Sequence, residues 1–340
     1  MAQRDALVVS LESGGLSSRP RASRHLWVLR RLGVGIAVLL LTSILVFAAT
    51  QALPGDAARA VLGRQATPQQ IAELQAQLGL DEPVVSQYVG WLTGLLTGDL
   101  GVSLAAHLPV GEVIGNRLVN SLALVLLTSV VAIPLGIGLG TLSAYRRDGP
   151  FDRALLLSSL GLTALPEFVV GLLLLILLST TFLKIFPAVA IIPPGETAFS
   201  HLDKLVLPVA TLVLVVTPYL YRLVRGSMID VLESEYIRMA WLKGMPPRRI
   251  LLFHALPNSF GAAIQASALV MVYLLGGIVV IEYLFEYPGL GQALVNAVSA
   301  RDIPVIQATV LLFAAGVVLF NLVADVLTVY VNPRLRRGGS

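Results

Sequence analysis

The chain has 340 residues, of which 56% are hydrophobic and 13% are charged, about half the charged share of an ordinary soluble domain. This composition excludes a soluble globular protein and indicates an all-α integral membrane protein, while the absence of cysteine excludes disulfides and thiolate metal sites. The formal net charge of +4 does not indicate a nucleic-acid partner, because the basic residues are sorted by loop, as membrane topology requires.

Six apolar stretches are long enough to cross a bilayer core of about 30 Å as helices, which takes roughly 20 residues. The predicted spans are Leu32 to Leu53, Leu118 to Ala144, Ala154 to Leu183, Leu205 to Tyr221, Ser259 to Ile281 and Val305 to Val331. The fourth is the weakest, because Pro208 and Pro218 interrupt it. The first exceeds the apolar region of a typical signal peptide, about 7 to 15 residues, and therefore favours an uncleaved anchor helix.

Between the first two spans, residues 56–117 are too many for a simple connector. Thr67, Pro68 and Gln70 stand where a capping residue, a first-turn proline and a capping-box glutamine belong, so a helix is predicted to begin there and to stop at Gly79. A second amphipathic helix follows and includes Trp91. These helices are predicted either to cap the bundle at the membrane surface or to form a docking surface for an external partner.

Lysine and arginine alternate between rich and poor segments along this series of spans. The rich segments are the N-terminal tail, the loop after the second span, the loop after the fourth span counted from Arg222, and the C-terminal tail, and they hold 18 of the 24 basic residues. Under the positive-inside rule these segments are cytoplasmic. Both termini are therefore predicted inside the cell, with residues 1–26 and 333–340 as cytoplasmic tails.

The segment between the fourth and fifth spans is more ordered than a connecting loop requires. Ser227 to Lys243 is predicted to be one amphipathic helix that ends at Gly244. Two prolines follow, at 246 and 247, and they fit the first turn of a second helix because they lack backbone N–H groups. The prediction is a basic helical elbow, residues 227–258, that projects from the bundle. Composition alone would favour a solvated loop kept for topology.

The elbow carries a motif. Residues 235–244 read EYIRMAWLKG, with Leu256-Pro257 after them, and resemble the EAA loop of ABC importer permeases in the form found in the dipeptide and oligopeptide branch. The double alanine of the nominal motif is Tyr236-Ile237 here, as is usual for that branch. The RLVNS sequence at 117–121 resembles the start of that family's core, and 78–101 resembles its external loop.

Later segments continue the match, which covers roughly residues 27 to 337. They are FEYPGLG at 285–291, Arg301-Asp302-Ile303-Pro304 and Asn332-Pro333-Arg334, where the family commonly has Asp in place of Asn332. The resemblance implies a type I ABC importer permease fold with six transmembrane helices and an extracytoplasmic loop subdomain. Residues 27–117 would hold the first helix and that subdomain, and 118–332 the core.

The resemblance also implies a function and partners. The chain would be a permease subunit in a bacterial inner membrane that moves dipeptides or oligopeptides, delivered by an extracytoplasmic substrate-binding protein, together with a second homologous permease subunit. It would not itself be an enzyme and would hold no cofactor: it has no GxxxxGK[ST] sequence, so ATP and Mg would bind two cytoplasmic ATPase subunits. The residues implied to couple to them are Glu235, Arg238, Ala240, Lys243, Gly244, Arg248, Arg249 and Pro257.

Charged residues in or beside spans are further candidates, since each costs about 2.5 to 3.5 kcal/mol at the bilayer centre on insertion scales. Glu167 is predicted either to line the pathway, where it would bind a peptide's amino group, or to have a structural partner in the bundle. Asp325 lies one turn after Asn321, which favours a packing network over a pathway role. Glu282 and Glu286, like Trp91, are candidates for an external gate or a dock for the binding protein. The glycines at 136, 138 and 140 are interpreted as sites of close helix packing in preference to bending.

Two alternatives stay open for the cargo and one for the class. The same branch also imports nickel and glutathione, so either is an alternative to peptides. An ion-coupled secondary transporter is the rival from another class, but such proteins usually show internal repeats and several ionisable residues near the midplane. A membrane-embedded hydrolase is disfavoured, because the sequence has no HExxH and no paired-aspartate motif.

Overall fold

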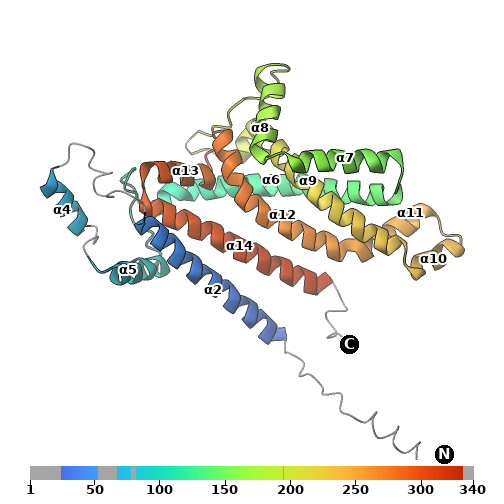
Figure 1. The fold of residues 1–340 in the computed structure, drawn as a ribbon, viewed down its shortest axis with the longest axis horizontal. Helices are drawn as coiled ribbons and strands as arrows, with labels where there is room; N and C mark the ends of the chain where they lie inside the picture. The colour runs from blue at the N-terminus through green and yellow to red at the C-terminus, as the bar shows by residue number, and fades with distance from the viewer. Residues whose placement is uncertain (1–23, 53–66, 78–81, 194, 332–340) are drawn as a thin grey trace, which may run out of the picture.

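The computed structural model describes residues 24–52, 67–77, 82–193 and 195–331. Five long helices make up most of this part of the chain, as Figure 1 shows: α2 (Arg24–Gln51), α6 (Val110–Tyr145), α9 (Leu202–Leu232), α12 (Leu256–Leu284) and α14 (Ile303–Val331). Shorter α-helices lie between them: α4 (Pro68–Gln77), α5 (Val84–Thr97), α7 (Pro150–Ala164), α8 (Glu167–Leu175), α10 (Glu235–Leu242), α11 (Pro247–Ile250) and α13 (Leu290–Ala300). The predicted helix stop at Gly79, the Asn332-Pro333-Arg334 match and the two tails, apart from residues 24–26, lie outside the described residues.

Six segments of the described chain suit a bilayer by length and composition. Five are single helical runs: Leu29–Gln51, Val110–Tyr145, Ala198–Leu232, Pro247–Leu284 and Ile303–Leu327. The sixth is a bent pair, Pro150–Ala164 with Glu167–Thr180, if the pair is counted as one span. The predicted all-α membrane fold with six spans is therefore confirmed.

The third predicted span, Ala154 to Leu183, is wrong as one straight helix. α7 ends at Ala164, α8 begins at Glu167, and the two helices are bent by 102°. The cause is Pro166, which lacks an N–H and biases the residue before it towards extended backbone; Leu165 has φ −92° and ψ 132°. The helix pair is thus a broken span or a re-entrant loop, with Glu167 in the first turn of its second helix.

The fourth predicted span is longer and more regular than the sequence indicates. α9 continues through Pro208 and Pro218 and ends only at Leu232. It packs against α6, α7, α8 and α12, and such neighbours hold a membrane helix together where a proline removes a backbone hydrogen bond. Arg222 and Arg225, counted above as loop residues, therefore lie inside a helix.

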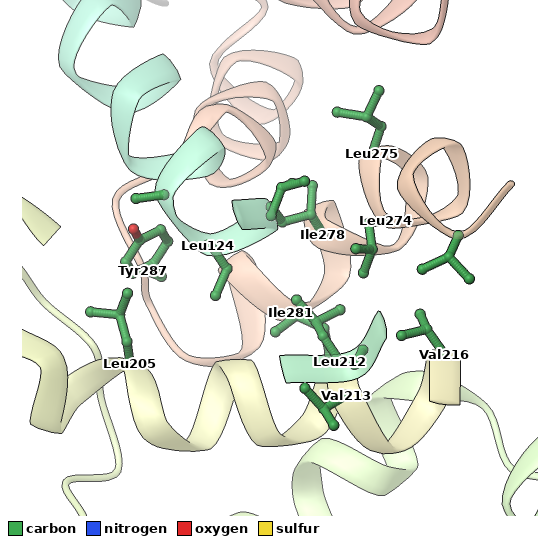
Figure 2. Close-up of a cluster of buried hydrophobic side chains, with 14 of the residues drawn as sticks. Leu124, Leu205, Leu212, Val213, Val216, Leu274, Leu275, Ile278, Ile281 and Tyr287 are labelled. Carbon is green, nitrogen blue, oxygen red and sulfur yellow. The ribbon is translucent and has the colours of Figure 1, made fainter. Parts of the chain in front are cut away.

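The core of the bundle lies where α9 packs against α6 and α12. Buried aliphatic side chains from the three helices meet there, as Figure 2 shows: Leu124, Leu205, Leu212, Leu274, Ile278 and Ile281. A Cβ atom on Gly136 would lie 2.6 Å from Leu220, and one on Gly140 would lie 2.9 Å from the carbonyl oxygen of Tyr221. The predicted close packing is thus confirmed for these two glycines, whereas Gly138 faces open space. Such contact matters because lipid tails are as apolar as leucine, so packing stabilises the helix pair.

The residues between α2 and α6 form the two short helices that were predicted. At the start of α4, the Gln70 N–H donates to Thr67 Oγ1 at 3.3 Å, and the Thr67 N–H donates to the Gln70 side chain at 2.9 Å. α5 packs on α2 through its aromatic residues: the ring centroids of Phe47 and Tyr88 are 5.4 Å apart, and those of Phe47 and Trp91 are 5.8 Å apart. Trp91 therefore helps to hold α5 against the bundle.

The buried carboxylate of Asp302 fastens the loop after α5 to the corner between α13 and α14. It accepts hydrogen bonds from the Ser103 hydroxyl, from the Leu104 N–H at 3.1 Å and from the Ala105 N–H at 3.3 Å. Charge-assisted bonds of this kind are about twice as strong as neutral ones. The Arg301-Asp302 motif therefore positions the loop on the bundle.

Candidate functional site

Two interruptions of the helix, one after α9 and one at Gly244, shape the elbow. α9 ends at Leu232 and α10 begins at Glu235, with Ser234 extended at ψ 150° between them, so the single helix predicted over Ser227 to Lys243 is wrong. The predicted stop is correct: Gly244 has φ +73°, and its N–H donates to Trp241 O at 2.9 Å. Only glycine adopts this left-handed conformation at no steric cost.

The second half of the elbow runs directly into the fifth span, as predicted. α11 starts at Pro247, and a π-helical turn at Leu251–Ala255 joins it to α12. Pro257 follows this turn and has no N–H to give to the preceding turn, and a π-helical turn is one way for a helix to absorb the missing bond. Figure 1 shows α10 and α11 at the end of the bundle that also holds the α6–α7 turn.

The inner face of the elbow is a small apolar core. Ile237, Ala240 and Ile250 are buried, and they belong to one cluster with Met228 of α9 and Ala144 of α6. Ala240 therefore holds α10 on the bundle and presents no side chain to the outside. The elbow is therefore fixed to the ends of α6 and α9.

The outer face of the elbow is exposed and mixed in character. Leu242 is 81% exposed and Phe253 73%, and Tyr236, Met239, Trp241 and Leu252 are exposed as well. The charged candidates of the same segment are exposed too: Glu235, Arg238, Lys243, Arg248 and Arg249, as is Pro257. Glu235 and Arg238 form a weak ion pair at 3.5 Å. Large apolar side chains exposed in such number on one short segment are typical of a protein or membrane contact.

At the other end of the bundle, Glu282 lies in a polar network with no exposed surface. Its carboxylate accepts bonds from the Ser121 hydroxyl at 2.5 Å and from the Gly291 N–H at 2.6 Å. Gly289 faces it so closely that an added Cβ would lie 2.1 Å from the carboxyl carbon. Direct docking of an external protein on Glu282, one of its two expected roles, is therefore excluded in this conformation. Glu286, four residues on, is exposed and has φ +51°.

Tyr287 extends this network. Its hydroxyl donates to the Asn120 carbonyl at 2.7 Å, and the Asn120 side chain donates to Pro288 O at 2.9 Å. Burial, and secondly the nearby charge of Glu282, raise the pKa of Tyr287, so the hydroxyl stays a donor. The motif residues at 117–121 and 285–291, far apart in sequence, thus hold one corner together.

Glu167 and Asp325, the two pathway candidates, both have partners. The Tyr273 hydroxyl donates to Glu167 Oε2 at 2.8 Å. Asp325 pairs with Arg31 of α2 at 2.8 Å, whereas Asn321 bonds to Val317 O in its own helix. The packing network expected for Asp325 thus forms with α2 and not with Asn321.

A cavity of about 380 Å³ lies beside Tyr273, between the end of α7, α9 and α12. Its walls are mostly apolar, with Thr163, Tyr219 and Tyr273 as polar residues and Arg222 as the single charged one. Small-molecule sites usually have this construction, with a few polar groups in an apolar pocket of about 300 to 1,000 Å³. The sequence analysis missed the cavity, because the fourth span was ended at Tyr221 and Arg222 was assigned to a loop.

One turn further along α9, Arg225 is bound by Asp152. Its Nε donates to Asp152 Oδ1 at 2.7 Å and its Nη2 to Oδ2 at 2.6 Å, while the Ser143 hydroxyl bonds to the same carboxylate. Asp152 is 1% exposed. This two-pronged pair joins α7 to α9. The sequence gives no local sign of this Arg225–Asp152 pair, because the two residues are 73 positions apart.

Comparisons with known proteins agree on one family. A family model described as binding-protein-dependent transport system inner membrane component matches residues 132–337, and an N-terminal model for the same kind of membrane component matches residues 25–125. The chain is 37% identical over 309 residues to a putative peptide transport system permease protein of Brucella abortus (strain 2308), which covers 91% of this chain and 98% of the relative.

Two further relatives have similar coverage. A probable peptide ABC transporter permease protein of Sinorhizobium fredii is 34% identical over 312 residues, 91% of this chain and 99% of its own. A glutathione transport system permease protein of Salmonella typhi is 37% identical over 310 residues, with 91% and 98% covered.

Proposed function

Because the chain belongs to the family of binding-protein-dependent transport system inner membrane components, and is thus a multi-pass permease subunit of an ABC importer, we propose that its cargo is peptides and that separate ATPase subunits drive it through the elbow. Relatives named for peptide transport support the cargo. Glutathione is the second candidate, supported by the relative named for it, and it is itself a small peptide.

The observation that carries the coupling role is the contrast between the two faces of the elbow. The inner face is packed on α6 and α9, and the outer face exposes Leu242, Phe253 and a rim of basic side chains. A short helix with apolar anchors suits docking into a groove. Rim ion pairs from Arg248 and Arg249 would add only about 0 to 1 kcal/mol each, so the apolar anchors supply most of the contact.

The proposed assembly follows from this role. Two cytoplasmic ATPase subunits bind ATP and Mg, and this chain holds no cofactor. An extracytoplasmic binding protein delivers the peptide, and a second, homologous permease subunit completes the pathway. The chain is placed in a bacterial inner membrane with the elbow and both termini in the cytoplasm, which the distribution of basic residues supports.

The elbow proposal is tested at Gly244. In the complete importer, Gly244→Asp should abolish ATP-dependent uptake of a labelled peptide while the protein still accumulates in the membrane. Aspartate tolerates φ +73° better than most residues, and a Cβ there meets no atom within 4 Å, so the change adds a negative charge and some backbone strain at the corner, and the control carries the same strain.

The matched control is Gly195→Asp. Gly195 also has a positive φ, +84°, and open space around its Cβ, but it lies between the third and fourth spans, away from the elbow. Uptake should be close to wild type in this variant. Normal uptake by Gly244→Asp would contradict the coupling role.

A further inference from the structure

Among the described residues, Arg222 is the only charged one that lines the cavity between α7, α9 and α12. It is partly buried within the apolar span Ala198–Leu232, and in the described part of the chain no hydrogen bond or ion pair engages its guanidinium. A guanidinium in such surroundings carries an uncompensated charge, which a buried anion would neutralise.

The comparison with Arg225 shows that the missing partner is specific to Arg222. Both arginines belong to α9 and are one turn apart, yet Arg225 is held by both oxygens of Asp152. The protein therefore supplies an internal carboxylate for one arginine and leaves the other facing the cavity. What fits Arg222 is the same chemical group, a carboxylate, from a molecule in the cavity.

The opposite charge lies next to the same cavity. Tyr273 lines it and donates its hydroxyl to Glu167. A molecule that carries a carboxylate and an ammonium group would have the positive charge of Arg222 on the wall and the negative charge of Glu167 directly behind Tyr273. An unblocked peptide is such a molecule.

We propose that this cavity is a peptide-binding site in the permease and that Arg222 binds the free C-terminal carboxylate of the cargo during translocation. The inference rests on the proposed import of peptides. The guanidinium offers two parallel N–H donors that match a carboxylate, and Thr163 and Tyr219 place further polar groups on the wall. The apolar lining leaves the side chains of the peptide without specific polar contacts, which suits a carrier of many sequences.

The test compares a peptide that has a free carboxylate with the same peptide as its C-terminal amide. ATP-dependent uptake of both is measured in the complete importer, for a pair that the binding protein loads, and the ratio of acid to amide uptake is calculated for wild type and for Arg222→Gln. The preference of the binding protein enters both ratios equally and cancels. We expect the ratio to fall by about 10- to 100-fold in the variant, as for loss of a hydrogen-bonded charge.

Two further variants make the result specific. Arg153→Gln makes the same change on α7 at an exposed position outside the cavity and should keep the wild-type ratio. Arg222→Lys keeps the charge without the two-pronged geometry, so its ratio should lie between those of wild type and Arg222→Gln. If Arg222→Gln does not accumulate in the membrane, the acid-to-amide ratio of Arg222→Lys decides whether Arg222 binds the carboxylate.

The outcomes separate this inference from the function it rests on. A wild-type importer that takes up no peptide overturns both. Peptide uptake with an acid-to-amide ratio that Arg222→Gln or Arg222→Lys leaves unchanged overturns only the site. That second result, with both peptides slowed equally, is what would follow if Arg222 paired with a carboxylate of the second permease subunit instead.

Discussion

The two ends of this bundle use their motif residues in opposite ways. Around Glu282, residues that are 161 to 168 positions apart in the chain are buried and bonded to one another. On the outer face of the elbow, the charged residues are exposed and only one weak ion pair links two of them. Motif residues in the first group have buried partners from distant parts of the chain, whereas the charged residues in the second have at most this one exposed pair.

A sequence motif can be required for folding or for contact with a partner, and the two ends differ in which of these requirements they indicate. The buried end needs its residues in order to fold, so changes there should lower stability first and transport only as a result. Under the proposed coupling role, the exposed end uses its residues for contact with another protein, so changes there should lower transport and leave stability unchanged. Substitutions at the two ends should therefore differ most in their effect on stability.

Glu282→Ala should destabilise the protein by roughly 2 to 6 kcal/mol, because the Ser121 hydroxyl and the Gly291 N–H each lose a buried acceptor at about 1 to 3 kcal/mol. Thermal unfolding of the purified permease in detergent measures the effect. Glu286→Ala, four residues further along the chain but exposed, is the control and should stay within about 0.5 kcal/mol of wild type. Equal unfolding temperatures for the two variants would show that burial at the Glu282 corner does not stabilise the protein, which contradicts the proposed difference between the two ends.

Leu242→Glu should leave stability unchanged but reduce capture of the ATPase subunits by the permease at least about tenfold, since burying a leucine is worth about 1.5 to 3 kcal/mol. Co-purification from cells that make the complete importer measures this. The control is Leu96→Glu on α5, where the leucine is 78% exposed, close to the 81% of Leu242. Loss of ATPase in both variants would point to a general defect and not to a surface on the elbow.

Local signals in the sequence predicted much of this division, and long-range packing supplied the rest. The stop at Gly244, the helix start at the two prolines and the capping of α4 by Thr67 depend on a few neighbouring residues, and the structure agrees with each. The position of Glu282 beside the end of a predicted span also made it a candidate, but its burial depends on residues more than 150 positions away. Sequence position therefore indicated the corner without indicating that it is closed to the outside.

The prolines show the same limit. Pro166, Pro208 and Pro218 look alike in the sequence, and the expectation was that the last two would weaken a span. The helix ends before Pro166, whereas α9 stays helical through Pro208 and Pro218. The difference arises because α9 is packed on several neighbours. The same error in the end of α9 concealed Arg222, since a residue assigned to a loop needs no partner.

The smallest effect is expected at Arg238, where the comparison between the ends can be expressed as one interaction energy. A double-mutant cycle with Glu235→Ala and Arg238→Ala, measured by unfolding of the permease alone, should give a coupling of about 0.2 to 0.5 kcal/mol that weakens as salt is added. Both side chains are largely exposed and 3.5 Å apart. A coupling of the size of a buried pair, about 3 kcal/mol or more, would mean that the elbow is stabilised from within like the Glu282 corner. The exposure of its outer face would then no longer argue for a partner.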